Sequence, residues 1–405
     1  MKTVDILIQN ASELITLKGP NAPRTNQQMS NLSIIKNASV AIDKGKIVEV
    51  GNNLNYRGET TLDAQGKTVM PGFVDCHTHV VFAGSREFEL DMKLKGFSYM
   101  DILKKGGGIF YTVEQTRQAS KEQLLKQSSQ RLDTMLSHGT TTCEAKSGYG
   151  LETKTEMKIL NVQQQLQQTH AMDIVSTFLG AHAIPKDMNS DEYVSQILSE
   201  MLPKTKGLAQ FCDVFCEKDV FTTKQSQQIL EAGKENGLIP KIHADEIVDT
   251  GGASLAASVG AISADHLLRS SDEGLRALAN SGVVGVLLPG TPFSLMMDEY
   301  SPARKMIDFG VAVALATDLN PNCYGENMQL VIQLACLKMK MTPAEAVCAA
   351  TFNSSCALGL NDTIGSLEAG KQADVLILNC PNHSFIPYHF GVNLVETVIK
   401  KGKII

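Results

Sequence analysis

The two ends of the chain share a pattern in which apolar and polar residues alternate. Residues 4–8 and 39–42 show it near the start, followed by a turn-forming stretch at 43–46. Residues 374–378 and 395–399 show it near the end, with a second turn at 400–403. A period of two is typical of half-buried strands, so both ends are predicted to form antiparallel strands. We expect the two ends to pair into one composite domain.

The middle of the chain, from about residue 68 to residue 358, has a different pattern of apolar and polar residues. Short apolar runs alternate with longer helix-compatible stretches, which is typical of parallel βα units. Eight runs are strand candidates, at residues 72–80, 139–145, 174–181, 211–217, 238–244, 261–266, 283–288 and 312–318. Eight such units favour a (β/α)8 barrel, which typically takes about 250 residues. A doubly wound α/β sheet is the alternative.

The expected domain boundaries follow from these patterns. Residues 1–67 and 359–405 are predicted to form the composite domain, and residues 68–358 the barrel. A chain of 405 residues has room for two or three domains of about 150 residues each, so one barrel with a small second domain fits. Residues 19–32 are rich in Pro, Asn and Gln and are predicted to form a loop.

Composition and charge narrow the kinds of partner. The 37 Lys and Arg residues against 43 Asp and Glu residues give a net charge of −6, opposite to the usual balance of nucleic-acid-binding proteins. No apolar run approaches the ~18 residues of a membrane span, and Asp5 and Glu13 interrupt the first apolar stretch, unlike a secretory signal. We therefore predict a folded cytoplasmic protein that binds neither nucleic acid nor membrane. The nine cysteines form no C-x-x-C pair, which indicates reduced thiols.

Residues that can bind a metal follow four of the predicted strands. His77 and His79 end the first, His243 the fifth, His266 the sixth and Asp318 the eighth. Side chains two apart on a strand point the same way, so His77 and His79 can hold one ion. Each motif alone is more often an ordinary histidine or a helix cap, but the carboxyl ends of barrel strands meet at one face. Three histidines and an aspartate there make a suitable ligand set for zinc or iron.

The segment from Pro71 to His79 resembles the first-strand motif of the amidohydrolase superfamily, Pro-Gly-Phe-Val-Asp-x-His-x-His. Residues 365–374 resemble the segment in which these proteins return to their second domain. The resemblance implies a (β/α)8 TIM barrel with a small composite β-sandwich built from both chain ends. Binuclear members carry a carbamylated lysine at the end of strand four, where this chain has Cys216 and Glu217. The resemblance therefore implies a single metal ion.

Within the superfamily, several stretches resemble the imidazolonepropionases. They are residues 82–86, 106–109, 146–151, 179–182, 243–246 and 318–321. The resemblance implies hydrolysis of the cyclic amide of 4-imidazolone-5-propanoate to N-formimidoyl-L-glutamate, in histidine degradation. It also implies one Zn²⁺ or Fe³⁺ per chain and a homodimer. Asn322 and Cys323 depart from the small Gly-Ser or Gly-Thr pair expected after Asn320-Pro321.

The same resemblance assigns roles to individual residues. The metal ligands would be His77, His79, His243 and Asp318, and the general base one of Glu246, His266 and Asp318. Arg86 has the planar fork that suits a propionate group. The remaining substrate-binding candidates are Tyr149, His182, Glu246, Asn320, Asn322 and Cys323. Two alternatives stay open, namely a related mononuclear deaminase acting on an amidine or ring amine, and a non-catalytic barrel scaffold.

Overall fold

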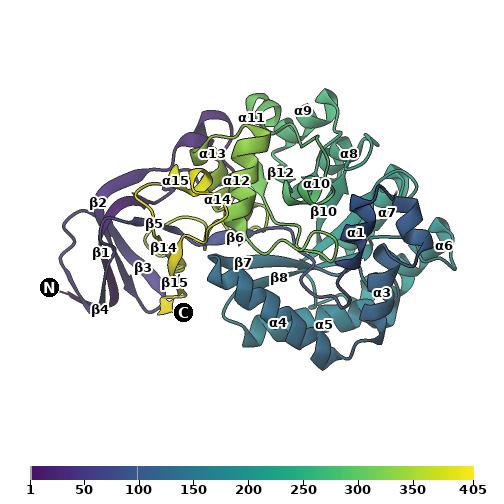
Figure 1. Ribbon diagram of the computed structural model, residues 1–405, viewed down its shortest axis with the longest axis horizontal. Helices are drawn as coiled ribbons and strands as arrows, with labels where there is room; N and C mark the ends of the chain where they lie inside the picture. Colours follow the sequence, from purple (N-terminus) through teal and green to yellow (C-terminus); the bar gives the residue numbers. More distant parts are fainter. Residues whose placement is uncertain (1, 98) are drawn as a thin grey trace.

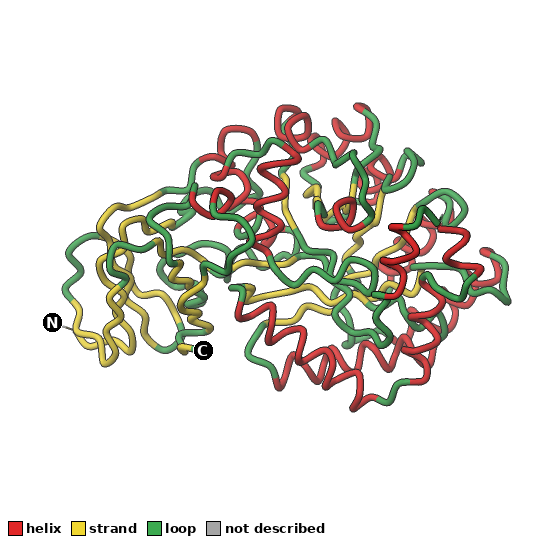
Figure 2. The backbone as a smooth tube through the Cα atoms, in the orientation of Figure 1, coloured by secondary structure: helices red, strands yellow, loops and turns green. Residues whose placement is uncertain are grey.

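The chain folds into two parts that lie side by side (Figure 1). The computed structural model describes residues 2–97 and 99–405. One part is a ring of parallel strands with helices around it, and the other is a sheet domain at the left of the view, where both termini lie (Figures 1 and 2). None of the helices in the described residues combines the length and the apolar character needed to cross a bilayer.

Eight parallel strands form the barrel, each hydrogen-bonded to the next along the chain. They are β6 (Phe73–Asp75), β7 (Thr140–Lys146), β8 (Asp173–Ala181), β9 (Phe211–Cys216), β10 (Ile239–Ala244), β11 (Ser263–His266), β12 (Val284–Leu287) and β13 (Val313–Leu315). The (β/α)8 barrel is confirmed, with a strand in each of the eight predicted runs. The doubly wound alternative is wrong, because the strand order never reverses along the sheet.

The ring closes just beyond the ends of its first and last strands. Thr78 forms a parallel bridge with Leu319. The backbone N–H of Asp318 donates to the carbonyl of His77 (3.1 Å), and that of His79 donates to the carbonyl of Leu319 (2.7 Å). The closure therefore joins two segments that carry predicted metal ligands.

Helices follow every barrel strand, and the longer ones surround the ring (Figure 2). In chain order they are α1 (Phe88–Leu94), α2 (Tyr99–Lys104), α3 (Ile109–Gln118), α4 (Lys121–Ser137), α5 (Thr153–Thr169), α6 (Ser190–Gln196) with η2 (Ile197–Met201) and η3 (Leu202–Lys204), α7 (Thr223–Glu235), α8 (Gly252–Val259), α9 (Asp272–Ser281), α10 (Gly290–Ser294), α11 (Ala303–Phe309), α12 (Met328–Met339), α13 (Pro343–Ala349) and α14 (Phe352–Cys356). Ser120, Thr222 and Thr342 begin α4, α7 and α13 with capping boxes, which satisfy backbone N–H groups at the helix starts.

The second domain is one sheet to which both chain ends contribute. Its strands are β1 (Lys2–Ile15), β2 (Ile34–Asp43), β3 (Lys46–Gly51), β4 (Tyr56–Asp63), β5 (Thr68–Pro71), β14 (Val375–Leu378), β15 (Val395–Lys400) and β16 (Lys403–Ile404), with α15 (Phe385–Tyr388) between β14 and β15. The predicted composite domain is confirmed, because β5 pairs with β1 on one side and with β14 on the other. These pairings make β5 a strand of this sheet. The exact boundaries at 67 and 358 stay a prediction.

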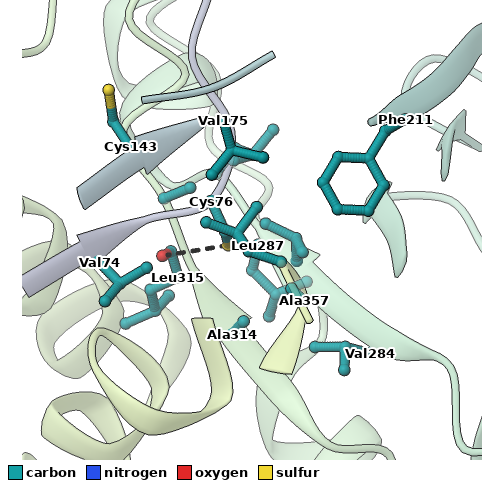
Figure 3. Close-up of a cluster of buried hydrophobic side chains, with 14 of the residues drawn as sticks. Val74, Cys76, Cys143, Val175, Phe211, Val284, Leu287, Ala314, Leu315 and Ala357 are labelled. Carbon is teal, nitrogen blue, oxygen red and sulfur yellow. Dashed lines mark hydrogen bonds between the residues drawn. The ribbon is translucent and has the colours of Figure 1, made fainter. Parts of the chain in front are cut away.

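Apolar side chains from several barrel strands pack into a buried cluster (Figure 3). Val74, Cys76, Leu287 and Leu315 are among them, and each is at most 1% exposed. The thiol of Cys76 points toward the carbonyl oxygen of Leu315, 3.9 Å away (Figure 3). Close packing of this kind leaves little freedom for the strands, so it fixes the polar residues that follow their ends.

The predicted loop at residues 19–32 is anchored to the barrel. It contains η1 (Asn26–Ser30), whose Met29 is buried. The buried amide of Asn353 accepts from the backbone N–H of Arg24 (2.8 Å) and donates to the Arg24 carbonyl (3.0 Å). It also donates to the carbonyl of Val313 in β13 (2.9 Å). Asn353 thus joins the N-terminal segment to the last barrel strand.

Replacing this amide should destabilise the fold. Asn353→Ala leaves a buried backbone N–H and two carbonyls without partners, so we expect the free energy of unfolding to fall by about 2–3 kcal/mol. The measurement is the thermal midpoint by circular dichroism. Asn361→Ala is the control, because it removes an exposed hydrogen bond to Asn21 and should change little. Equal midpoints for the two variants would contradict the assignment.

Candidate metal centre

Three histidines from two sides of the barrel meet at the carboxyl ends of its strands. His77 and His79 follow β6, and His243 lies in β10. Each offers one ring nitrogen, and these atoms lie within 4.8 Å of one another. All three side chains are buried, with at most 3% of each residue exposed. The sequence prediction that these residues share one site is thus matched by their positions.

Asp318 faces the same group from beyond β13. Its Oδ1 lies 3.6 Å from Nε2 of His77 and 3.7 Å from Nε2 of His79. Its Oδ2 accepts a hydrogen bond from the hydroxyl of Thr291 in α10 (2.6 Å). Asp318 has a φ of +53°, a left-handed conformation that costs an ordinary residue energy and often marks a functional site. The turn aims its carboxylate at the histidines.

The chemistry of the donors fits a metal ion. Nε2 of His77, Nδ1 of His79 and Nε2 of His243 are buried without a hydrogen-bond partner in the described residues. Burial lowers the pKa of all three imidazoles well below the usual value, so they are neutral at pH 7 and keep a free lone pair. Leaving buried polar atoms unpaired is costly, and a cation held between them would remove that cost. His77, His79 and His243 therefore form a metal-binding group.

His266 and Glu246 lie beside this group. The His266 ring is 5.1 Å from that of His243, centroid to centroid, and its Nδ1 is 3.5 Å from a carboxylate oxygen of Glu246. Burial lowers the pKa of His266 to about 4. Burial, helped by the charges of Asp318 and Glu217, raises the pKa of Glu246 to about 8. At neutral pH His266 is thus unprotonated, while Glu246 keeps its proton.

Two aspartates that the sequence analysis did not assign contact the histidines from behind. Asp265 in β11 accepts a hydrogen bond from Nδ1 of His77 (2.6 Å). Asp213 in β9 has an oxygen 3.0 Å from Nδ1 of His243. Carboxylates in this position commonly orient metal-binding imidazoles. The available signal was an acidic residue inside an otherwise apolar strand, as in Phe-Cys-Asp-Val at 211–214.

Tyr149 and His182 form a wall next to His79. The ring of His182 stacks on that of His79 at 4.9 Å, and the Tyr149 ring lies 5.6 Å from His79 and 5.3 Å from His182. The carboxylate of Glu156 accepts from the backbone N–H groups of Gly148, Gly150 and Leu151, and so shapes the loop that presents Tyr149. The structure thus brings both predicted substrate-binding residues to the metal-binding group.

Arg86 is paired with an acid instead of standing alone. Its Nε and Nη2 each donate to one oxygen of Glu89 (2.8 Å both), and Glu89 is buried. Glu89 also accepts from the backbone N–H of Gly108 (2.6 Å), which ties α1 to the glycine-rich turn before α3. This bidentate pair uses one edge of the guanidinium and leaves Nη1 for another partner.

Asn320, Asn322 and Cys323 form one compact turn after β13. The side-chain oxygen of Asn320 accepts from the backbone N–H groups of Asn322 (2.8 Å) and Cys323 (2.9 Å), and its amide donates to the Asp318 carbonyl (2.9 Å). Asn322 in turn accepts from Nζ of Lys93 in α1 (2.5 Å). The Cys323 thiol is buried and faces the Thr317 carbonyl at 3.9 Å. In this structure Asn320 therefore shapes the turn.

The end of the fourth barrel strand offers little to a second ion. The carboxylate of Glu217 accepts from the backbone N–H groups of Lys218 (2.8 Å), Ile247 (2.8 Å) and Val248 (3.3 Å). Burial raises the pKa of the Cys216 thiol, which disfavours the thiolate that binds metals. Both side chains thus serve the adjacent loop.

Comparisons with known proteins agree with this site. The model of the amidohydrolase family matches residues 68–405. An imidazolonepropionase from Alkaliphilus metalliredigens is 51% identical over alignments covering 99% of this chain and 98% of the relative. One from Geobacillus kaustophilus is 54% identical, covering 99% and 97%.

The chain belongs to the amidohydrolase family, and within it to the imidazolonepropionases. The resemblance stated from the sequence is confirmed. A solved adenosine deaminase from Xanthomonas campestris with bound zinc has a TM-score of 0.74 and 19% identity, covering 100% of this chain and 93% of the other. At that identity it shows the shared fold alone.

Protons should compete with the metal mainly at Asp318. Burial raises the pKa of this carboxyl to about 6, whereas burial lowers the pKa of each of the three histidines well below its usual value. We expect zinc affinity to stay constant from neutral pH down to about pH 6, and then to fall tenfold per pH unit as one proton binds Asp318. Competition with a chromophoric chelator measures it.

The control for this prediction is Asp318→Asn, which cannot take up the proton. Its zinc affinity should be lower than that of the unaltered protein and nearly independent of pH over the same range. An unchanged acidic fall in this variant would show that the histidines take up the protons instead.

Proposed function

We propose that this chain hydrolyses 4-imidazolone-5-propanoate to N-formimidoyl-L-glutamate in histidine degradation, using the site at the carboxyl end of the barrel. The observation that carries the proposal is identity of about half of all positions with imidazolonepropionases along essentially the full chain. The reaction breaks a carbon–nitrogen bond of a cyclic amide by adding water. It needs a nucleophilic water, a proton for the leaving nitrogen and an anchor for the propionate.

We infer that one ion, Zn²⁺ or Fe³⁺, is held by His77, His79, His243 and Asp318. The donors are nitrogen and oxygen, which both ions accept. A bound metal ion supplies Lewis acidity, which makes water a better nucleophile near neutral pH. The engagement of Glu217 with backbone N–H groups supports a single ion.

Two carboxyl groups that differ in protonation state carry out the two proton transfers of the reaction, one accepting a proton and the other donating one. Asp318, with a pKa of about 6, is ionised at pH 7 and accepts a proton from the attacking water. Glu246, with a pKa of about 8, holds a proton that it donates to the ring nitrogen as the carbon–nitrogen bond breaks. The neutral His266 beside Glu246 stabilises the negative charge that develops on the carbonyl oxygen.

The remaining predicted residues bind the substrate. Nη1 of Arg86 is free of Glu89 and binds the propionate, while Tyr149 and His182 contact the ring from the wall beside His79. Binding of the new carboxylate by Asn320, Asn322 and Cys323 stays a prediction, because the backbone N–H groups of Asn322 and Cys323 already donate to Asn320. The predicted homodimer and cytoplasmic location stay predictions.

The whole proposal is tested by the loss of ultraviolet absorbance of freshly made 4-imidazolone-5-propanoate. We expect fast decay with zinc-loaded protein, none after chelation, and formation of N-formimidoyl-L-glutamate without ammonia. His243→Ala is the metal-site control. Release of ammonia from an amidine or ring amine, with no decay of this substrate, would favour the deaminase alternative. Absence of both activities and of bound metal would favour the scaffold.

Glu246→Gln should lower kcat by about 10²–10⁴-fold, because the amide cannot donate a proton to the leaving nitrogen. KM and zinc content should change little, since Glu246 is not among the proposed ligands. Steady-state kinetics at pH 7 with metal analysis gives both quantities. A kcat close to that of the unaltered protein would remove Glu246 from the reaction.

Arg86→Met should raise KM for the propionate substrate at least about tenfold, because the charge-assisted contact between Nη1 and the propionate is lost. Arg57→Met, an exposed arginine of β4, is the matched control with no expected effect. The double variant Arg86→Met/Glu89→Gln removes the carboxylate that the single variant leaves unpaired. An unchanged KM in both Arg86 variants would contradict the assignment.

A further inference from the structure

A buried lysine lies behind the metal-binding histidines. Lys146 ends β7 and is wholly inaccessible to solvent. Its Nζ lies 2.6 Å from Asp213, 3.0 Å from Glu144 and 3.3 Å from Asp265. Burial alone would lower the pKa of this ammonium group, but the three carboxylates outweigh it and raise the pKa, so Lys146 is charged.

The carboxylate oxygens that contact Lys146 also face the histidines. Oδ2 of Asp265 lies 2.6 Å from Nδ1 of His77, and Oδ2 of Asp213 lies 3.0 Å from Nδ1 of His243. One ammonium group therefore connects both aspartates, and through them two histidines from opposite sides of the site. The oxygen of Asp265 is shared between His77 and Lys146, and that of Asp213 between His243 and Lys146.

Two buried carboxylates this close to one cation depend on it. Without the ammonium group their charges would repel in a medium of low polarity, and the two side chains would turn away from each other. This movement would break the hydrogen bond from Nδ1 of His77 to Asp265 and the close contact of Asp213 with Nδ1 of His243, which orient the two imidazoles. Second-layer contacts of this kind typically change metal affinity by about 10–100-fold.

We propose that Lys146 is the positioning residue of the metal centre, holding Asp213 and Asp265 so that His243 and His77 present their Nε2 atoms to one ion. The inference rests on the proposed metal site, and it adds a residue that touches neither ion nor substrate.

Lys241 is the matched control within the same interior. It lies in β10, is equally buried, and its Nζ donates to Glu144 (2.9 Å) and to the carbonyl of Cys76 (3.2 Å). Among the described residues it forms no ion pair with Asp213 or Asp265. Replacing either lysine by methionine removes a buried positive charge that acts on both aspartates, but of the two only Lys146 contacts them directly.

The experiment compares Lys146→Met, Lys241→Met and the unaltered protein by zinc affinity, in competition with a chelator, and by the visible spectrum of bound Co²⁺. Lys146→Met should bind zinc at least about tenfold more weakly and shift the Co²⁺ bands, because the ligand histidines are reoriented. Lys241→Met should lower the thermal midpoint but keep both zinc affinity and spectrum.

The inference would be overturned if Lys146→Met had the same zinc affinity and the same Co²⁺ spectrum as the unaltered protein. It would also be overturned if Lys146→Met and Lys241→Met lost zinc affinity to the same extent. If Lys146→Met does not fold, the double variant Lys146→Met/Asp213→Asn is compared with Asp213→Asn, and it should bind zinc more weakly because Asp265 is released. Equal affinity of those two would overturn the inference. An unaltered protein that binds no zinc would overturn the metal centre itself.

Discussion

The closure of the barrel between its first and last strands is the constraint on which the site depends. The backbone of His77, Thr78 and His79 is bonded to that of Asp318 and Leu319, so ligands more than two hundred residues apart in sequence are held by the same few hydrogen bonds. Neither segment continues as a regular strand at this point. His77, His79 and Asp318 therefore lie just beyond the regular strands, held by this closure above a closely packed interior.

The site also has to keep several charges away from water. Glu144, Asp213 and Asp265 carry negative charge inside the barrel, and Lys146 and Lys241 carry positive charge among them. Buried ions are tolerated only when they are paired and hydrogen-bonded, and each of these has a partner of opposite sign. The neutral imidazoles beside them complete a polar interior in which a cation is favoured at one place.

Much of this arrangement was predictable from the sequence. The eight strands were recognisable because each is a short apolar run, and the ligands were recognisable because a polar residue follows such a run at its carboxyl end.

Asp213, Asp265 and Lys146 were not assigned roles, because their partners come from other strands and spacing along the chain does not record those contacts. The pairing of Arg86 with Glu89 was missed for a related reason, since the sequence does not show which guanidinium N–H groups of a loop arginine already donate to another side chain. The loop at 19–32 has a loop-like composition, yet the buried amide of Asn353 anchors it from far along the chain.

Strand β5 connects the two ends of the molecule in a way that bears on its synthesis. It pairs with β14, and the N–H of Gly72 donates to the carbonyl of Asp374 (3.0 Å), directly before the strand that leads to His77 and His79. During synthesis, a chain whose β14 has not yet left the ribosome therefore lacks the β5–β14 pairing next to its first barrel strand. A truncated polypeptide that ends before β14 keeps every proposed metal ligand but has no partner for one edge of β5. The first barrel strand and its metal ligands therefore gain part of their support only after β14 has been synthesised and has paired with β5.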